Sequence, residues 1–446
     1  MDLAVVGAGL SGARAVIELV HVLDAHRHPL SRPLRVALID PAPDHGRGVP
    51  YGNRSDRRAL LIETLAQTRC PEFSRWIGEH RVLLAEMQHS QDTDDRAWHR
   101  RNAAAVAAGD LADLYLPRHV FGAFSESSLE DALALGRRNG LLTVTSHCAE
   151  VVEIEPSAGG SYGLRCSDGT SMECGAVLIA VGSIPRGDGF LPTLGQPLAH
   201  RYITDQAYCG SFQLRDAFDL YQSRESAGPV RLAIIGAAAS AIESLYCVVN
   251  HPPLSQRIES ITTISRSGML PGGITGNRSV IASDYAIRRT SADVYVQTAR
   301  ELLARGHLDI VPARVGSIEA VPGALRLELI DTLDGQRTQT EFDLIINCSG
   351  AGDVQTSRSR LLNFLGQRLE VRRQGRGFRT NGDHSLAQWP RVFLAGPLLN
   401  GGDAGSDVES ISAVFKVGRE LGQALAASLT GSGAGMATAP RSAQGT

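Results

Sequence analysis

The sequence predicts an α/β protein in which one unit occurs twice: a strand, a glycine-bearing turn, a helix and a second strand. The first copy opens the chain, and the second begins near residue 231. The length of 446 residues points the same way. It exceeds what one hydrophobic core normally supports, so two or three domains are expected.

The first copy has the order and spacing of a dinucleotide-binding fingerprint. Residues 2–6 read as an apolar strand, residues 7–12 read Gly-Ala-Gly-Leu-Ser-Gly, and residues 13–23 have the apolar pattern of a helix. A second apolar strand, 34–39, ends at Asp40. This combination predicts a site for an ADP-containing cofactor, in which Asp40 accepts hydrogen bonds from ribose hydroxyls. The alternative is a glycine-rich turn that binds nothing.

Each residue of this turn has an expected role. Gly7 permits the tight turn, Gly9 lets the backbone approach a pyrophosphate, and Gly12 allows the helix to pack closely on the strand. Leu10 and Ser11 complete the turn before the helix, whose N-terminus offers unpaired N–H groups and a partial positive charge to the phosphates. We therefore expect the whole turn to contact the cofactor.

The second copy departs from the glycine pattern. After the strand 231–235, the turn begins at Gly236, but Ala238 stands where the middle glycine is expected. The added methyl group leaves less room for a pyrophosphate to approach the backbone. Gly236 and Ser240, at the turn and the helix start, are the residues expected to contact the second dinucleotide.

The strand 258–264 of the second copy leads to Arg266 rather than to an acid. An acid at this position pairs with a free 2′-hydroxyl, whereas an arginine suits a 2′-phosphate. Arg266 therefore favours NADPH over NADH. The alternative is that Arg266 is only a solvated loop residue.

Further helices and strands are expected in the sequence between and after the two copies. Residues 41–52 read as an ordered loop, 72–108 as helical, and 117–138 as another helix, followed by strands at 141–144, 149–154, 163–166 and 177–180. Three strands end in small-residue turns where a backbone can touch a ligand. These turns contain Gly182, Gly350 and Gly396. A last helix is expected over about 408–425.

Composition excludes several classes of function. A net charge of −3 implies no nucleic-acid partner, and no apolar run reaches the ~18–20 residues that span a bilayer. The chain opens directly on a strand, which leaves no room for a signal peptide, so a cytoplasmic location is expected. None of the seven cysteines forms Cys-x-x-Cys, which argues against a redox-active disulfide and a clustered metal site.

The motifs resemble those of flavoproteins that bind two dinucleotides. They are the 7–12 turn, Ile39-Asp40-Pro41, the loop Gly46-Arg47-Gly48-Val49-Pro50-Tyr51-Gly52, the segment Pro117-Arg118-His119-Val120-Phe121-Gly122, Val181-Gly182-Ser183-Ile184-Pro185 and Ala395-Gly396-Pro397-Leu398. Among such flavoproteins, the chain is similar to bacterial flavin-dependent N-hydroxylating monooxygenases and related FAD/NAD(P)-binding proteins. The resemblance covers residues 2 to about 425.

The resemblance implies two Rossmann-like domains, with the NADP domain inserted in the FAD domain. The expected boundaries are 1–200 and 345–430 for the FAD domain, 201–344 for the NADP domain, and 431–446 for a disordered tail. It also implies FAD and NADPH as cofactors, with O2 and a small-molecule amine, such as that of an amino acid, as substrates. The amine would be N-hydroxylated through a flavin C4a-(hydro)peroxide.

Four residues are assigned roles on weaker grounds. Arg47 and Arg118 are candidates for contacts to the FAD phosphates or the flavin edge, with surface ion pairs as the alternative. Asn277 corresponds to a substrate-contacting asparagine of the family and is the catalytic candidate, although an asparagine in a loop also favours a turn. Arg278 is the candidate that anchors a substrate carboxylate, against the alternative of a solvated face.

Three rival functions remain open at this point. The same apparatus can oxygenate sulfur or carbon, or the protein can be an FAD-dependent NAD(P)H oxidoreductase that inserts no oxygen. The third is a nucleotide sensor or scaffold without catalytic turnover, which remains possible because Ala238 replaces a glycine of the second fingerprint. The sequence does not decide the substrate, the number of oxidation steps or whether the chain forms a homo-oligomer.

Overall fold

The computed structural model divides into two compact units. It describes residues 1–26, 30–52, 57–184, 200–204, 210–225, 228–276, 291–350, 352–357, 359–399 and 410–431. Unit 1 comprises Met1–Gly48, Ser125–Gly182 and Ser359–Thr446, and unit 2 comprises Val49–Phe124 and Ser183–Arg358. The expected boundaries at residues 200 and 345 separate an FAD domain from an NADP domain. They stay a prediction, because the two compact units do not reveal which cofactor each one binds.

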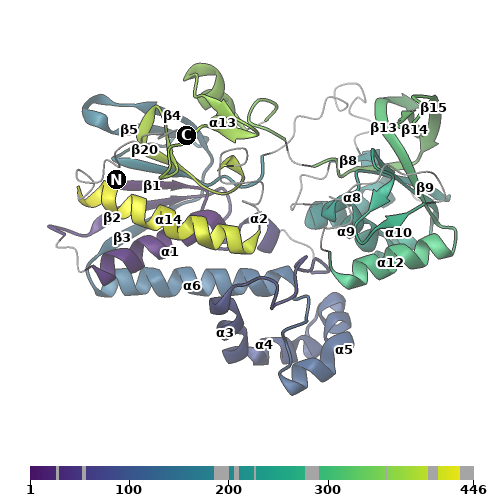
Figure 1. Cartoon of the computed structure of the whole chain (residues 1–446), viewed down its shortest axis with the longest axis horizontal. Coiled ribbons are helices and arrows are strands. Elements are labelled where there is room, and N and C mark those ends of the chain that lie inside the picture. Colours follow the sequence, from purple (N-terminus) through teal and green to yellow (C-terminus); the bar gives the residue numbers. More distant parts are fainter. Residues whose placement is uncertain are drawn as a thin grey trace, which may run out of the picture. The chain divides into compact units, whose positions relative to one another are not determined.

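Unit 1 is built on a six-stranded sheet in the order β19-β20-β7-β1-β2-β3 (Figure 1). Its strands are β1 Leu3–Val6, β2 Leu34–Ile39, β3 Leu142–His147, β7 Ala176–Ile179, β19 Ser385–Leu386 and β20 Trp389–Leu394. All pairings are parallel except β19 with β20. β1 is central and fully buried, as its uninterrupted apolar sequence predicts for a parallel strand covered on both faces.

Two helices of unit 1 pack along each other, α1 (Leu10–Ala25) and α14 (Ile411–Thr430), as Figure 1 shows. The contact is close because α14 presents Gly418 and Gly422 to α1. A Cβ atom on Gly422 would lie 2.5 Å from the Cβ of Glu18. The guanidinium of Arg14 covers the Phe415 ring at 4.1 Å from its centroid. Small residues therefore set the distance between these helices.

Smaller elements complete unit 1. They are the antiparallel sheet β4 Val151–Pro156, β5 Tyr162–Cys166 and β6 Ser171–Cys174, the hairpin β17 Arg373–Gln374 with β18 Gly377–Phe378, and the helices α13 Arg360–Asn363, η2 Ala158–Gly160, η4 Phe364–Arg368 and η5 Gly396–Leu399. The long helix α6 (Arg118–Arg138) contributes its residues from Ser125 onward to this unit. Its expected start and end are confirmed.

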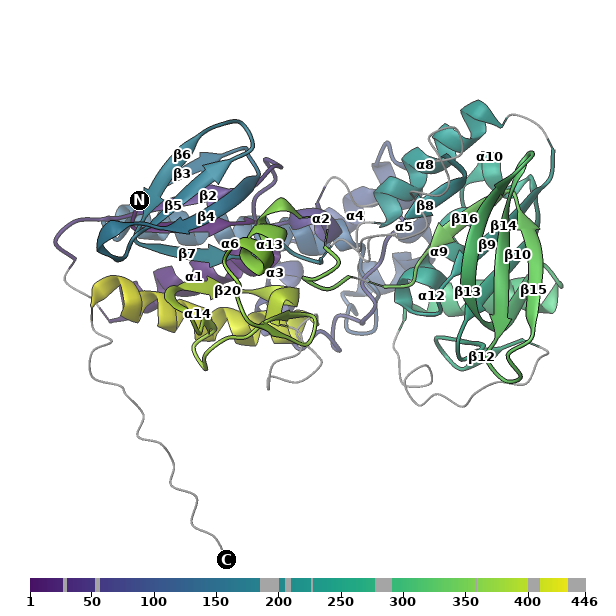
Figure 2. The same cartoon turned by 90° about the horizontal axis from the view of Figure 1, so that it is seen from above.

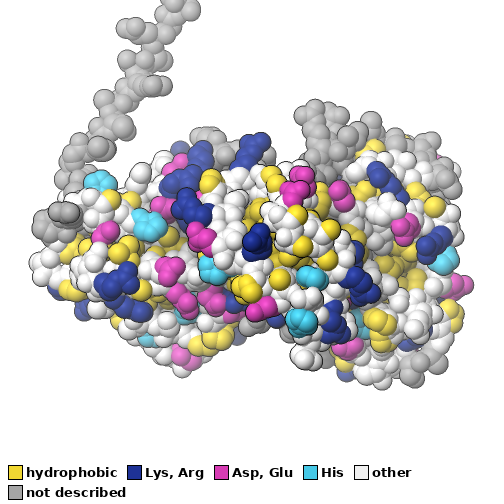
Figure 3. Space-filling model, turned by 90° about the horizontal axis from the view of Figure 1, so that it is seen from below, with side chains coloured by type: hydrophobic (Ala, Val, Ile, Leu, Met, Phe, Trp, Pro, Cys, Tyr) yellow, Lys and Arg dark blue, Asp and Glu magenta, His cyan; other side chains and the backbone are white. Residues whose placement is uncertain are grey.

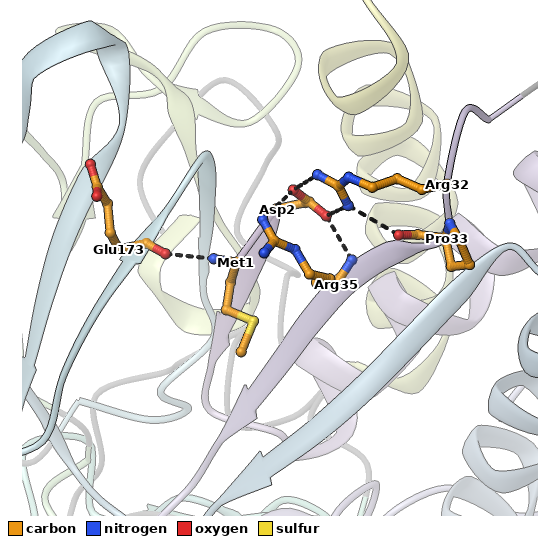
Figure 4. Close-up of polar contacts among 6 residues, drawn as sticks. All are labelled: Met1, Asp2, Arg32, Pro33, Arg35 and Glu173. Carbon is orange, nitrogen blue, oxygen red and sulfur yellow. Dashed lines mark hydrogen bonds and ion pairs between the residues drawn. The ribbon is translucent and has the colours of Figure 1, made fainter.

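A polar cluster joins β1 to β2 at the amino ends of these strands (Figure 4). The Asp2 carboxylate accepts hydrogen bonds from Arg32 Nη1 and Nη2, at 2.6 and 2.8 Å, and from the Arg35 backbone N–H at 2.7 Å. The Met1 nitrogen donates to the Glu173 carbonyl at 2.6 Å. Hydrogen bonding from the Arg32 guanidinium holds the pKa of the Asp2 carboxyl well below its usual range.

Unit 2 has a seven-stranded sheet in the order β15-β14-β13-β10-β9-β16-β8. Its strands are β8 Tyr202–Thr204, β9 Val230–Ile235, β10 Ile258–Ser265, β13 Leu308–Val321, β14 Ala324–Asp331, β15 Arg337–Phe342 and β16 Leu344–Asn347. β8, β16, β9, β10 and the start of β13 run parallel, and β13, β14 and β15 form an antiparallel meander. Figure 2 shows this meander beside β9 and β10.

The helices of unit 2 come from two separate parts of the chain. They are α2 Gly48–Tyr51, α3 Pro71–Glu79, α4 Arg81–Glu86, η1 Met87–His89 and α5 Thr93–Ala108 from the first part, and α8 Gly210–Arg224, α9 Ala239–Val249, α10 Pro252–Ser255 and α12 Asp293–Ala304 from the second. The short hairpin β11 Met269–Leu270 with β12 Ile274–Thr275 completes the unit.

The predicted fold class, α/β with parallel sheets and a repeated strand–turn–helix–strand unit, is confirmed. β1-α1-β2 and β9-α9-β10 are the two copies. No helix in the described ranges is long and apolar enough to cross a membrane. On the face drawn in Figure 3, basic and acidic side chains are interspersed, and neither forms a continuous stripe.

Candidate functional site

The first glycine turn has the backbone shape that the fingerprint predicts. Gly7 has φ +94° and donates its N–H to the Ile39 carbonyl at 2.8 Å, which ties the turn to the end of β2. A side chain at Gly7 would collide with the carbonyl of Ala180, just after β7. Glycine is thus required here for both conformation and space.

The beginning of α1 has backbone donors that the helix itself does not satisfy. Gly9 is its N-cap, and no side chain caps the helix. The N–H groups of Leu10, Ser11 and Gly12, in the first turn, therefore have no partner within the helix. Gly12 lies so close to the carbonyl of Gly7 that a Cβ atom would collide with it. This arrangement is the one that binds a phosphate at a helix N-terminus.

Asp40 contacts the turn from the end of β2. One oxygen of its carboxylate accepts a hydrogen bond from the Ala8 N–H and the other from the Ala42 N–H, both at 2.9 Å. Each carboxylate oxygen has two lone pairs, so two backbone bonds leave acceptor capacity for ribose hydroxyls. Asp40 thus holds the turn in shape and remains suited to its predicted role.

Arg47 lies in a loop that touches the turn. The N–H of the preceding Gly46 donates to the Ala8 carbonyl at 2.7 Å. Arg47 Nη2 forms a 2.6 Å ion pair with Glu126 Oε2, and its Nε is buried with no hydrogen-bond partner among the described residues. Sequence reasoning did not single out Glu126, because nothing local links two residues 79 positions apart.

Two further predicted glycines end strands of unit 1. Gly182 follows β7 with φ +79°, and the space beside it is open. Gly396 follows β20, and a Cβ atom there would lie 2.9 Å from Ser11 Oγ in the first turn of α1. Gly396 therefore lies against the helix start that forms the phosphate site, whereas Gly182 borders open space.

The second turn repeats the geometry of the first. Gly236 has φ +122°, donates its N–H to the Ile264 carbonyl at 2.8 Å, and would collide with the Cys348 carbonyl if it carried a side chain. The Cys348 N–H donates to the Ile235 carbonyl at 2.7 Å, as the Ala180 N–H donates to that of Val6 in unit 1. These matched bonds extend the duplication from sequence pattern to backbone hydrogen bonding.

The correspondence continues to the neighbouring strand end and to the helix. Gly350, two residues after Cys348, has φ +99° and open space beside it, as Gly182 has two residues after Ala180. Ala238 is the N-cap of α9, which also lacks a side-chain cap, and Ser240 is in its first turn. The predicted contacts of unit 2 therefore occupy the same relative positions as those of unit 1.

Arg266 directly follows β10, and its side chain is exposed. Thr332 Oγ1 donates to the Arg266 carbonyl at 3.0 Å and so fixes the backbone at this position. No hydrogen bond or ion pair of the Arg266 guanidinium is seen within the described part of the chain. The position after the second strand is where a 2′-phosphate is expected.

Arg118 belongs to a buried polar network inside unit 2. Its guanidinium pairs with Glu243 of α9, and its Nε donates to the Leu60 carbonyl at 3.0 Å. The Tyr295 hydroxyl accepts from the Leu60 N–H at 2.8 Å and donates to the Arg58 carbonyl at 3.3 Å. Burial raises the pKa of the Tyr295 hydroxyl well above its usual value, so this group stays a neutral donor.

This network links residues 58–60 and the first residue of α6 to α9 and α12. Glu243 and Tyr295 were not foreseen, because the partners of Arg118 and Leu60 lie 125 and 235 positions away in the chain. The predicted contact of Arg118 with FAD stays a prediction. Asn277, the catalytic candidate, and Arg278, the substrate candidate, lie outside the described residues.

The described geometry fits a bound dinucleotide in unit 1. An uncapped helix start and a turn that excludes side chains lie together, and the loop that carries Arg47 contacts this turn through the backbone of Gly46 and Gly48. Asp40 supplies acceptors for a ribose beside it. These are the groups that FAD would require at its ADP portion.

Comparisons with known proteins agree with this geometry. Residues 4–184 match a family model described as FAD-NAD(P)-binding. An uncharacterized protein of Mycobacterium tuberculosis is 28% identical over 413 residues, which cover 89% of this chain and 73% of that protein.

Two solved structures extend the likeness to nearly the whole chain. The ornithine hydroxylase PvdA from Pseudomonas aeruginosa, in its reduced form, has a TM-score of 0.63 at 16% identity and covers 96% of this chain and 99% of its own. The FAD-bound cadaverine monooxygenase DfoA from Erwinia amylovora has a TM-score of 0.61 at 12% identity, with coverages of 96% and 94%. The predicted resemblance is confirmed: the chain has the fold of flavoproteins with two dinucleotide-binding domains, and its residues 4–184 match the FAD-NAD(P)-binding family model.

Proposed function

We propose that this protein is an NADPH-dependent FAD monooxygenase that N-hydroxylates the amine of a small molecule, with amino acids as the first class to test. The observation that carries the proposal is the duplicated turn. Gly7 and Gly236 make equivalent backbone bonds in two units whose sheets both suit a dinucleotide. FAD belongs to unit 1, because the acid that suits its ribose, Asp40, is there.

The proposed reaction balances with one nicotinamide cofactor. NADPH, a proton, O2 and the amine give NADP⁺, water and the hydroxylamine. FAD, when bound, supplies the redox and oxygen chemistry. The chain's own residues bind and orient: the start of α1 and Arg47 hold the FAD phosphates, Asp40 holds its ribose, and Arg266 selects NADPH by its 2′-phosphate.

The amine substrate is supported by the solved neighbours. PvdA is named an ornithine hydroxylase and DfoA a cadaverine monooxygenase, and both cover nearly the whole chain. We assign substrate contact to Asn277 and Arg278, where Arg278 would hold a carboxylate bidentately. Cadaverine is lysine without its carboxylate, so R278A should weaken the reaction with lysine and leave that with cadaverine unchanged.

The experiment measures three quantities in one reaction. FAD-loaded protein is given NADPH and O2 with ornithine, lysine or cadaverine. NADPH consumption, hydrogen peroxide and the mass of the amine product are then followed. We expect one amine to gain one oxygen atom while the peroxide yield falls. If the amount of hydrogen peroxide equals the NADPH consumed with every amine, the protein is an oxidoreductase that inserts no oxygen.

A further inference from the structure

The Gly46–Gly48 loop is held between the phosphate-binding turn and α6. On one side, the Gly46 N–H donates to the Ala8 carbonyl at 2.7 Å, and a Cβ atom on Gly9 would lie 3.0 Å from the Gly48 Cα. On the other side, a Cβ atom on Gly46 would lie 2.9 Å from the Glu126 Cα. No side chain fits on either side, so the position of α6 fixes the position of the loop.

Two consecutive side chains of α6 fasten this loop. The Ser125 hydroxyl, which is buried, donates to the Gly46 carbonyl at 2.6 Å. The Glu126 carboxylate pairs with Arg47 Nη2 at 2.6 Å. One bond holds the backbone of the loop, and the other holds the end of the Arg47 side chain. The loop thus gains an ordered guanidinium beside the phosphate-binding turn.

The same guanidinium has an unused donor. Arg47 Nε is buried and has no hydrogen-bond partner among the described residues. A buried donor without an acceptor is unfavourable unless a ligand supplies one. Such a donor beside an uncapped helix start calls for an anionic acceptor, and a pyrophosphate oxygen has the right charge and chemistry. Arg47 would then bond Glu126 through Nη2 and the cofactor through Nε.

We propose that Glu126, supported by Ser125, is a positioning residue that orients Arg47 for the FAD pyrophosphate. The inference rests on the FAD part of the proposed function and needs no statement about the substrate. The expected direction of the effect of Glu126 on FAD affinity is unusual. A carboxylate near a pyrophosphate should weaken binding by repulsion, yet Glu126 strengthens it because the Arg47 side chain lies between them.

The experiment measures the dissociation constant of FAD for the apoprotein by flavin fluorescence. R47A should weaken FAD about 10- to 100-fold, the value of a lost charge-assisted hydrogen bond. E126Q should weaken FAD roughly 3- to 10-fold, and S125A should act in the same direction. E130Q is the matched control. It makes the same charge change one turn further along α6 at an exposed site, and FAD binding should stay within about twofold.

The decisive comparison is E126Q in two backgrounds. With Arg47 present, E126Q weakens FAD. In the R47A background, the same substitution should leave FAD affinity unchanged or improve it, because only repulsion remains to be removed. Thermal unfolding of each apoprotein separates loss of fold from loss of affinity. A purely structural salt bridge would lower the melting temperature without this reversal of sign.

The outcomes also separate this proposal from the proposed function. If E126Q behaves like E130Q, or weakens FAD equally in both backgrounds, Glu126 does not act through Arg47 and the inference is wrong. If FAD binds as expected but no amine is hydroxylated, the positioning role stands and the monooxygenase assignment fails. If the unaltered protein binds no FAD, both are wrong.

Discussion

At the scale of single residues, Asp40 combines two observed backbone hydrogen bonds with a proposed role in binding the FAD ribose. Its carboxylate accepts from the Ala8 and Ala42 N–H groups, at 2.9 Å each. We expect D40A to lower the free energy of unfolding by about 1–3 kcal/mol and to weaken FAD roughly tenfold, because both backbone donors lose their acceptor. Denaturant titration and FAD fluorescence measure the two effects.

The control for this substitution is D131N on α6, which changes an exposed carboxylate in the same unit. It should leave both quantities within experimental error. A D40A protein that loses stability but keeps full FAD affinity would show that Asp40 only shapes the turn. The ribose would then be held by other groups.

The proposed function assigns to Arg266 the choice between the two nicotinamide cofactors. R266A should raise the KM for NADPH at least tenfold and leave that for NADH nearly unchanged, because only NADPH carries the 2′-phosphate. Initial rates of NAD(P)H oxidation give both constants. R305A, an exposed arginine after α12 in the same unit, is the control. An equal loss for both cofactors would remove Arg266 from the site.

Local sequence predicted the residues whose roles depend on spacing along the chain. Gly7, Gly12 and Asp40 belong to one continuous pattern, and the structure gives them the expected turn, close packing and strand-end position. The acids that accompany the two arginines have no such pattern. Glu126 and Glu243 reach Arg47 and Arg118 only because segments far apart in the sequence come together in the fold.

At the scale of elements, the packing of α14 on α1 depends on two glycines. A Cβ atom on Gly422 would lie 2.7 Å from the backbone carbon of Glu18, which cannot move without moving α1. We expect G422A to lower the free energy of unfolding by about 1–3 kcal/mol through overpacking, despite alanine's higher helix propensity. Calorimetry or denaturant titration gives the value.

Gly78 in α3 is the matched control, because a Cβ atom there meets nothing within 4 Å. G78A should be neutral or stabilising by about 0.5–1 kcal/mol, as expected for a helical site with space. If both substitutions stabilised the protein to the same degree, close approach of the two helices would not be what keeps Gly422 a glycine.

The Asp2 cluster makes the stability of the contact between the amino ends of β1 and β2 sensitive to acid. The pKa of Asp2 is lowered in the folded protein, so its stabilising effect is present above the usual value of 3.8 and is lost as the pH falls below it. We expect D2N to destabilise the protein by about 1 kcal/mol near neutral pH. The difference should shrink towards zero in acid, where Asp2 is protonated. Urea titrations at several pH values measure it, and a constant difference would contradict the assignment.

The elements that sequence predicted best are those with strong apolar runs. β1, α1, β2, β9, α9 and β10 all appear where expected, and so does α6. The meander β13–β15 was not predicted, because the alternation of polar and apolar residues does not reveal that three consecutive strands pair with one another. Pairing partners are set by long-range packing, which a local pattern does not contain.

At the scale of the whole molecule, the duplication is the main organising feature. Each unit places a positive-φ glycine after the first strand of its repeat and ties it to the end of the next strand, and it has a further glycine, with open space beside it, three residues after the end of a third strand. The two copies differ where their ligands would differ. Unit 1 has Gly9 and Asp40, and unit 2 has Ala238 and Arg266.

The alanine in the second copy gives a prediction about the two dinucleotides together. Ala238 and Gly9 are the N-caps of α9 and α1, with similar backbone angles of φ −101°, ψ −170° and φ −71°, ψ −167°. The Ala238 methyl group therefore lies where a pyrophosphate approaches the helix. A238G should tighten NADPH binding about three- to tenfold and speed anaerobic reduction of the bound flavin at low NADPH.

The reciprocal change should act in the opposite direction on the other cofactor. G9A adds a methyl group that would lie 3.0 Å from the Gly48 Cα, so it should weaken FAD while leaving NADPH binding unchanged. Stopped-flow reduction and FAD titration of both variants give the four values. If A238G slows flavin reduction, the methyl group aids NADPH binding, and the second unit holds its dinucleotide differently from the first.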